Sequence, residues 1–337
     1  MTDNSFPFDI RPVDGTENDN LQKYFQGFKY IRVGPKNYFL INGYTEGAAY
    51  IYNMPLRPDD VFVASFPRSG TTWTQELVWL LANNLDYSTA ANVSLQKRYF
   101  FLEQSLFMTE EIKEKILKDN TNTEKNPLDD YNIPRAEETA KLPSPRFLKT
   151  HLPMSLLPPN LLDTTKVVYV ARDPRDVAVS YYHLSKLFKV SEYLGDFKSY
   201  WGFFIKDMVN WAPFFEHLKE AWQLRNHPNM LFLFYEELSK DLPTTVQRVA
   251  DFLGKQITKD QLAELCSHLS IDNFKKNSSV NYNEAKNSGI LTANESFIRK
   301  GKSGGWRDSF DEEMTREADI WIAKNLEDTD LRFPSML

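Results

Sequence analysis

Residues 61–73 read VFVASFPRSGTTW, and this stretch decides the fold class. Its apolar, β-branched beginning predicts a buried strand over residues 60–65, and the pattern of residues 75–82 predicts a helix. The turn between them contains Pro67, Gly70 and several hydroxyl side chains. At the N-terminus of a helix, backbone N–H groups lack intrahelical partners and the positive end of the dipole faces outward, so an anion binds readily. The stretch therefore predicts a phosphate-binding loop.

This loop is similar to a P-loop but is not an ordinary one. It has the glycine and the hydroxyls, but it lacks the Gly-x-x-x-x-Gly-Lys-Ser/Thr spacing of nucleotide triphosphatases. Arg68 stands before the glycine, whereas a P-loop has its lysine after it. A small-molecule kinase of the P-loop class is therefore a disfavoured alternative.

Short apolar runs alternate with amphipathic segments along the chain. Strands are predicted over residues 60–65, 146–149, 166–171 and 230–235. Such alternation indicates an α/β fold, a single domain whose parallel sheet is flanked by helices. Ligands of these sheets bind beyond the carboxyl ends of the strands. Polar clusters stand at these places, beginning with Arg68, Lys149, Arg172 and Tyr235.

The composition narrows the possible partners and compartments. With 337 residues, 42% of them hydrophobic, the chain can bury the core of one large domain. A net charge of −6 argues against nucleic acid as a partner. A single cysteine, Cys266, suits a reducing compartment, and neither a signal peptide nor an apolar run of about 18 residues is present. We expect a cytoplasmic protein that binds no membrane.

The polar clusters carry a family resemblance that spans most of the chain. They resemble the cytosolic sulfotransferases, which use the donor 3′-phosphoadenosine 5′-phosphosulfate (PAPS). The matching segments, in the family's order, are 57–60, 67–73, 149–153, 172–182, 232–236 and 299–301, with Gly304 and Trp306 after them. The long insertion before Lys149 and the segment 52–58 look most like the insect branch that includes retinol dehydratase.

The resemblance implies three catalytic side chains, His151, Lys149 and Arg68. His151 is the natural general base, because the ordinary pKa of histidine is about 6.5. In an extended segment residues i and i+2 share a face, so Lys149 and His151 can point into one pocket, where Lys149 would contact the transferring sulfonate. Arg68 stands where most vertebrate members have lysine, and it keeps the charge that would stabilise the bridging oxygen. Phe101 and His151 are expected to contact the acceptor.

The resemblance also implies the binding site for PAPS and its product PAP. Three groups of residues would form this site: Ser69, Gly70, Thr71 and Thr72 at the 5′-phosphate; Trp73, Tyr235, Leu269, Ser270 and Ile271 at adenine; and Arg172, Ser180, Arg299, Lys300 and Gly301 at the 3′-phosphate. Arg68 and Phe297 are also expected to bind the cofactor. Leu269 and Ile271 replace the family's Thr and Phe, so adenine recognition there would rest on apolar contact.

Metal, dimerisation and the insertion are less constrained by the sequence. The five histidines and one cysteine have no metal-ligand spacing, so no metal is expected, and His183, His217, His227 and His268 are interpreted as surface or helix histidines. A homodimer is possible, but the family's dimerisation motif is not legible after Trp306. The polar insertion at about 109–141 is interpreted as a lid, with a disordered insertion as the alternative.

The sequence thus predicts transfer of a sulfuryl group from PAPS to a hydroxyl of a small hydrophobic phenol or alcohol. Two alternatives on the same scaffold stay open. One is a lyase similar to retinol dehydratase that eliminates water through a sulfonated intermediate. The other is a nucleotide-binding protein without catalysis, suggested by Arg68 and Leu269.

Overall fold

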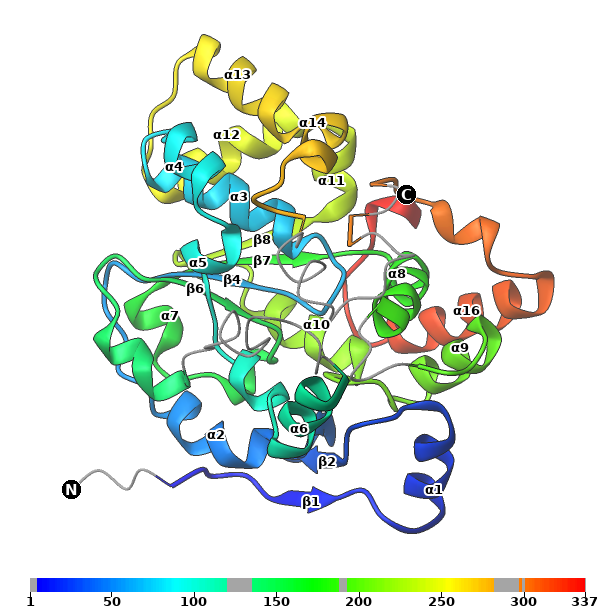
Figure 1. The fold of residues 1–337 in the computed structure, drawn as a ribbon. Coiled ribbons are helices and arrows are strands. Elements are labelled where there is room, and N and C mark those ends of the chain that lie inside the picture. The colour runs from blue at the N-terminus through cyan, green and yellow to red at the C-terminus, as the bar shows by residue number, and fades with distance from the viewer. Residues whose placement is uncertain (1–4, 120–134, 188–192, 282–296, 299–300, 337) are drawn as a thin grey trace.

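The structure, a computed structural model, describes residues 5–119, 135–187, 193–281, 297–298 and 301–336. A parallel sheet of five strands lies at its centre (Figure 1), with the order β5-β6-β4-β7-β8. Its strands are β4 (Val61–Ala64), β5 (Phe100–Phe101), β6 (Phe147–Thr150), β7 (Lys166–Ala171) and β8 (Met230–Phe234). All four predicted strands are confirmed, each to within one residue at either end, and so is the α/β fold class.

The helices follow the strands as the alternating pattern predicted. Their bounds are α1 (Gly15–Tyr24), α2 (Tyr44–Tyr52), α3 (Thr71–Ala82), α4 (Tyr87–Asn92), α5 (Leu95–Arg98), α6 (Glu110–Asp119), α7 (Leu161–Thr164), α8 (Pro174–Leu187), α9 (Phe197–Ile205), α10 (Phe214–Gln223), α11 (Tyr235–Lys240), α12 (Leu242–Leu253), α13 (Lys259–Leu269), α14 (Ile271–Lys276) and α16 (Glu312–Asn325). Short 3-10 helices are η1 (Gln104–Phe107), η3 (Ala136–Lys141), η4 (Met154–Leu156), η6 (Gly305–Asp308) and η7 (Pro334–Met336).

The sheet is buried on both faces. Phe62 and Ala64 of β4 belong to one hydrophobic core, whereas Val61 and Val63 belong to a second. Successive side chains of a strand point to opposite faces, so a strand covered on both sides is apolar throughout. Figure 1 shows α3, α12 and α13 on one side of the sheet and α10 and α16 on the other. The continuous apolar run that opens residues 61–73 follows from this double burial.

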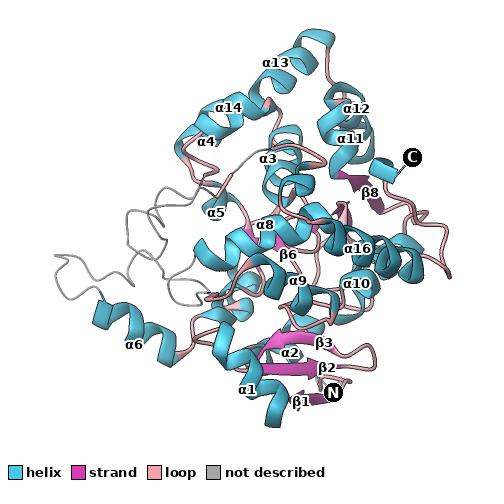
Figure 2. Cartoon of the chain, turned by 90° about the vertical axis from the view of Figure 1, so that its right-hand side faces the viewer, coloured by secondary structure: helices cyan, strands magenta, loops and turns pink. Residues whose placement is uncertain are grey.

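A second, antiparallel sheet lies near the N-terminus and was not predicted. It consists of β1 (Ile10–Pro12), β2 (Tyr30–Val33) and β3 (Tyr38–Ile41) in that order. Figure 2 shows it beside α1 and α2, at one side of the central sheet. The turn between β2 and β3 uses a positive φ at Gly34 and at Asn37, a conformation that both residue types adopt readily.

The predicted insertion at about 109–141 contains regular structure at both ends. Helix α6 occupies its beginning and η3 its end, whereas residues 120–134 lie outside the described part of the chain. The hydroxyl of Tyr50 donates to the backbone oxygen of Glu137 at 3.2 Å, which attaches η3 to α2. The role of this insertion as a lid stays a prediction.

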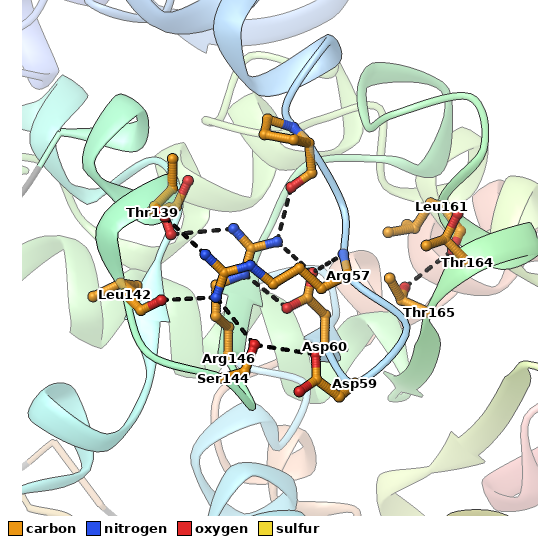
Figure 3. Close-up of polar contacts among 12 residues, drawn as sticks. Arg57, Asp59, Asp60, Thr139, Leu142, Ser144, Arg146, Leu161, Thr164 and Thr165 are labelled. Carbon is orange, nitrogen blue, oxygen red and sulfur yellow. Dashed lines mark hydrogen bonds and ion pairs between the residues drawn. The ribbon is translucent and has the colours of Figure 1, made fainter.

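The amino ends of β4 and β6 are joined by a buried ion pair. The guanidinium of Arg146 binds both carboxylate oxygens of Asp60, with Nε 2.7 Å from Oδ1, and both side chains are fully buried. The other nitrogens of Arg146 donate to the backbone oxygens of Thr139 and Pro55. Arg57 lies beside it and donates to the oxygens of Ala140, Leu142 and Ser144 (Figure 3). This Arg57–Asp60–Arg146 cluster ties the start of the sheet to η3.

Candidate active site

The loop between β4 and α3 has the geometry of an anion cradle. Gly70 caps α3 with φ +108°, and a Cβ there would come 2.8 Å from the ring of Tyr235, so only glycine fits. Ser69 is fully buried, and its hydroxyl has no hydrogen-bond partner among the described residues. Helix α3 begins at Thr71, four residues earlier than predicted, so Thr71, Thr72 and Trp73 form its first turn. The loop thus presents a helix N-terminus and an unpaired hydroxyl.

His151 follows β6 and is held by three neighbours. Its Nδ1 lies 2.8 Å from the backbone oxygen of Ser65, which can only accept, so Nδ1 carries the proton. Its own backbone N–H donates to Glu103 at 2.6 Å, and its backbone oxygen accepts from Nε2 of His217 at 2.9 Å. Among the described residues Nε2 of His151 has no hydrogen-bond partner. The imidazole therefore has a fixed tautomer with an available lone pair.

Burial decides the charge of this imidazole. It holds the pKa of His151 well below its ordinary value, and the positive charge of Lys149 lowers it further. His151 is therefore neutral at neutral pH, as a general base must be before it takes a proton.

Aromatic side chains surround His151 and Lys149. The ring of Phe101 makes an edge contact with His151 at 5.4 Å, and Trp211 makes another at 5.2 Å. Nζ of Lys149 lies 4.0 Å from the centroid of the Phe101 ring. Phe107 closes the group against Trp211 at 5.4 Å. The predicted Phe101 is thus beside the base, and Phe107 and Trp211 are apolar neighbours that the sequence analysis did not single out.

Two arginines, Arg172 and Arg68, lie together at the carboxyl end of β7. Arg172 stacks on Tyr235 at 4.0 Å and donates to the backbone oxygen of Arg68 at 3.2 Å. Its Nε is buried and has no partner among the described residues. The side chain of Arg68 donates to Oγ of Ser180 at 2.9 Å and to the backbone oxygen of Phe297 at 2.8 Å. Arg68, Arg172, Ser180 and Phe297 therefore form one group.

The segment after Gly301 is fastened to this group through Asp176. The carboxylate of Asp176 accepts from the backbone N–H of Gly304 at 2.7 Å and of Trp306 at 2.9 Å. Gly301 has φ +64°, and a Cβ there would come 2.7 Å from Ile271, so the predicted Gly301 and Ile271 are neighbours. Arg299 and Lys300 lie outside the described residues.

Trp73, Tyr235 and Leu269 come together from three elements. The ring centroids of Trp73 and Tyr235 are 5.7 Å apart, and Nε1 of Trp73 donates to the backbone oxygen of Leu269 at 2.9 Å. Ser270 caps α14, whose first residue is Ile271. An apolar platform thus lies next to the phosphate loop, as expected for a nucleotide base.

Two buried residues hold the main chain of His151. His217 lies on helix α10, one of the two places considered for it, but it is completely buried there, and its Nδ1 accepts from the hydroxyl of Tyr169 at 2.7 Å. Burial lowers the pKa of His217 to about 4, so it stays neutral. Glu103 was not singled out, although it lies two residues after the predicted acceptor contact Phe101. Sequence spacing carries no signal for either contact, because the partners are 48 and 66 residues apart.

The part of the chain that the structure describes offers neither a cluster of metal ligands nor a membrane-spanning helix. It contains no group of three or more His, Cys, Asp or Glu side chains that could hold a metal ion. No helix in the same residues has the length and apolar character needed to cross a membrane.

Known proteins match this chain over most of its length. The sequence model of the sulfotransferase domain matches residues 58–330. The luciferin sulfotransferase of Photinus pyralis is 32% identical over 305 residues, which cover 88% of this chain and 80% of that protein. Sulfotransferase 1A1 of Rattus norvegicus is 31% identical, with 87% and 94% covered.

Solved structures agree with the sequence comparisons. A crystal structure of retinol dehydratase in complex with androsterone and the inactive cofactor PAP has a TM-score of 0.92 and 47% identity, and the match covers 98% of this chain and 99% of that one. A complex of retinol dehydratase with retinol and PAP has a TM-score of 0.91 at the same identity. The predictions of a PAPS-dependent sulfotransferase and of a resemblance to retinol dehydratase are confirmed. This chain belongs to the sulfotransferase domain family and catalyses sulfuryl transfer.

Proposed function

We propose that this enzyme transfers a sulfuryl group from PAPS to the hydroxyl of a small hydrophobic phenol or alcohol, with His151 as the general base. The observation that carries the proposal is the state of His151. Its Nδ1–H is committed to the Ser65 carbonyl, and burial keeps the ring neutral. The lone pair of Nε2 is then available to an acceptor hydroxyl in the aromatic surroundings of Phe101 and Trp211.

The unpaired polar atoms at the strand ends fit the donor. PAPS supplies a sulfuryl group bonded to a phosphate that leaves as part of PAP. Ser69 and the N-terminus of α3 suit its 5′-phosphate, because hydroxyl and backbone N–H groups there lack partners among the described residues. Nε of Arg172 is likewise unpaired and suits the 3′-phosphate, together with Ser180 and Gly301. The Trp73–Tyr235 platform suits adenine.

The residues around the reacting groups have different roles: one accepts a proton, and two carry positive charge. His151 accepts the proton of the acceptor hydroxyl at Nε2, which makes the oxygen nucleophilic. Lys149 is buried beside Phe101, and its fixed charge favours negative oxygens at the transferring group. Arg68 supplies a second cation at the loop, and its contacts with Ser180 and Phe297 connect it to the 3′-phosphate residues. The aromatic rings exclude water from the site.

The size and polarity of the acceptor follow from the same surroundings. Phe101, Phe107 and Trp211 offer ring faces and edges, so a small hydrophobic molecule with one hydroxyl suits this side of His151. The retinol dehydratase complexes hold androsterone and retinol. We further propose that the enzyme works in the cytoplasm, in agreement with its single cysteine, and a homodimer remains a proposal to be tested by its mass in solution.

A second candidate function is elimination of water from an allylic alcohol through a sulfonated intermediate. The observation that favours it is the 47% identity to retinol dehydratase over nearly the whole chain. The two reactions share the first transfer step. They differ in whether the sulfonated product is released or loses sulfate.

The test combines sulfur-labelled PAPS with a panel of phenols, aliphatic alcohols and retinol, in the presence of a metal chelator. Label on an acceptor would support sulfuryl transfer as the end of the reaction. A PAPS-dependent conjugated product without label, followed by its absorbance, would support elimination. Tight PAP binding without either product would contradict the proposal and favour a nucleotide-binding protein without catalysis, whereas transfer of the label in the presence of the chelator would exclude the magnesium-dependent kinase alternative.

A further inference from the structure

Glu103 is a buried carboxyl that the reaction described so far does not use. It follows β5 and is the N-cap residue of η1, and it is 2% exposed. One oxygen, Oε1, accepts from the backbone N–H of His151 at 2.6 Å, whereas Oε2 has no hydrogen-bond partner among the described residues. A buried carboxyl with an unpaired oxygen costs stability. Because Glu103 contacts the general base, its role is to be sought in the reaction of His151 and not in the stability of the fold.

The charged and titratable groups that face Glu103 come from two elements. Lys149, Thr150 and His151 approach it from β6 and the residue after it, and the hydroxyl of Tyr44 faces it from α2. Burial raises the pKa of Glu103 to about 7, although the N–H of His151, the side chain of Thr150 and the charge of Lys149 each lower it. The charge of Lys149 thus favours the ionised form of Glu103, although no ion pair within 4 Å joins the two side chains.

We propose that Glu103 is a positioning residue for His151, holding its main chain and supplying the negative charge that stabilises the imidazolium formed during proton transfer. This inference rests on the proposed function, because it assigns Glu103 a role in the same step. His151 would become the second buried cation beside Lys149 when it takes a proton. The positive charges of Lys149 and of protonated His151 would repel each other in a desolvated site. The negative charge of the Glu103 carboxylate offsets that repulsion.

The contacts of His151 also fix the position of its main chain. Three different elements hold His151: Ser65 binds the ring, His217 binds the backbone oxygen and Glu103 binds the backbone N–H. The ring bond alone leaves the imidazole free to move with its main chain. The bond from Glu103 removes that freedom on the side of β5, from which Phe101 also contacts the ring.

The kinetic test compares Glu103→Gln with Glu103→Ala across pH 6 to 9, using the acceptor that receives most label in the panel. Glutamine keeps a side-chain oxygen for the His151 N–H but has no charge. In the wild type kcat should fall as pH drops below about 7, because protonation of Glu103 removes its charge. In Glu103→Gln, kcat should be about tenfold lower at pH 8 and show no fall near pH 7. KM and PAP affinity should be unchanged.

Glu103→Ala removes both the charge and the hydrogen bond, so its kcat should be lower than that of Glu103→Gln. Glu236 offers a matched control, since it is buried, its Oε1 accepts from the backbone N–H of Asp173 at 2.9 Å, and burial raises its pKa to about 7. Glu236→Gln should retain the fall of kcat near pH 7. A Glu103→Gln enzyme with the wild-type kcat and pH profile would overturn the proposal, as would equal kcat in the glutamine and alanine variants.

A second measurement does not depend on activity. With 15N-histidine labelling, the backbone amide resonance of His151 should titrate with a midpoint near pH 7 in the wild type and lose this titration in Glu103→Gln. If the wild type transfers no label to any acceptor, the proposed function fails, and the resonance alone then decides whether Glu103 is coupled to His151. Absence of the titration from the wild type would overturn the coupling even in an active enzyme.

Discussion

The two ends of the central parallel sheet both contain buried charged groups, but these groups are paired differently. At the amino end, all three nitrogens of Arg146 donate to Asp60 or to backbone oxygens, and Arg57 is similarly occupied (Figure 3). At the carboxyl end, Ser69, Glu103 and Arg172 each keep a buried atom without a partner among the described residues. The Arg57–Asp60–Arg146 cluster is internally complete, whereas the carboxyl end keeps polar atoms available to partners from outside the chain.

This difference distinguishes buried polar groups that stabilise the fold from buried polar groups that bind a ligand. A buried polar group is costly unless it is hydrogen-bonded, so a complete cluster needs no ligand. Unpaired atoms also occur away from the carboxyl ends of the strands, for instance at Tyr87 of α4 and at Tyr99, which immediately precedes β5. Lack of a partner therefore indicates a ligand only together with position, here the edge where parallel strands end.

The largest effect is expected from His151→Ala. It removes the available lone pair of Nε2 while the fold keeps its other contacts. We predict that kcat falls about 10²–10⁴-fold, the usual contribution of a general base, with little change in PAP affinity. Label transfer and calorimetric titration with PAP would be measured on the same preparation. Loss of PAP binding together with transfer would contradict the assignment of His151 as the base.

Breaking the amino-end cluster should instead lower stability. Asp60→Ala leaves Arg146 buried without its counter-charge, so we predict a loss of about 3–5 kcal/mol in the free energy of unfolding. Asp59 is the matched control, because it is exposed and, within the described ranges of the chain, accepts only from Ser144 at 3.3 Å. Asp59→Ala should cost about 0.5 kcal/mol or less. Urea unfolding measures both, and equal losses would show that the buried pair is not special.

Arg172→Ala tests whether the carboxyl-end cations serve a ligand. Hydrogen bonds to charged groups contribute about 1.5–3 kcal/mol, so PAP affinity should fall by that amount. Arg57→Ala is the contrasting variant. Among the described residues, the guanidinium of Arg57 donates to oxygens of Ala140, Leu142 and Ser144, in and just after η3, and so it serves the fold and not a ligand. This variant should lower the unfolding midpoint without weakening PAP binding. An Arg172→Ala variant that binds PAP normally would end the comparison between the two sheet ends.

The sequence predicted much of the sheet but not the contacts that complete the site. The strands β4 and β7 were legible because double burial makes them continuously apolar. Strand β5 has two residues and depends on pairing with β6, so its own sequence carries no strand pattern. The antiparallel strands β1, β2 and β3 have only three or four residues each, and no single one forms a long periodic run.

The site residues also divide into those that local sequence identifies and those that depend on contacts between distant segments. Gly70 and Trp73 were identified because they lie in one continuous motif. The bond from His151 to Glu103 and the bond from His217 to His151 join distant parts of the chain, and each uses a backbone atom of His151. Every residue has such backbone atoms, so neither composition nor spacing can announce these bonds. Their detection requires the fold.

The smallest effect, and the sharpest form of the comparison, comes from two serines. Ser69 is buried with an unpaired hydroxyl, whereas Ser144 accepts from Arg57 at 3.1 Å and donates to Asp59 on the exposed rim of the amino-end cluster. Ser69→Ala should leave the free energy of unfolding unchanged or raise it, because it removes an unsatisfied group, yet weaken PAP binding by about 0.5–1.5 kcal/mol. Ser144→Ala should change PAP binding not at all and stability by less than about 0.5 kcal/mol, since water replaces the hydroxyl. If Ser69→Ala destabilised the fold and bound PAP normally, the hydroxyl would be a structural group and the carboxyl end would have lost its distinguishing feature.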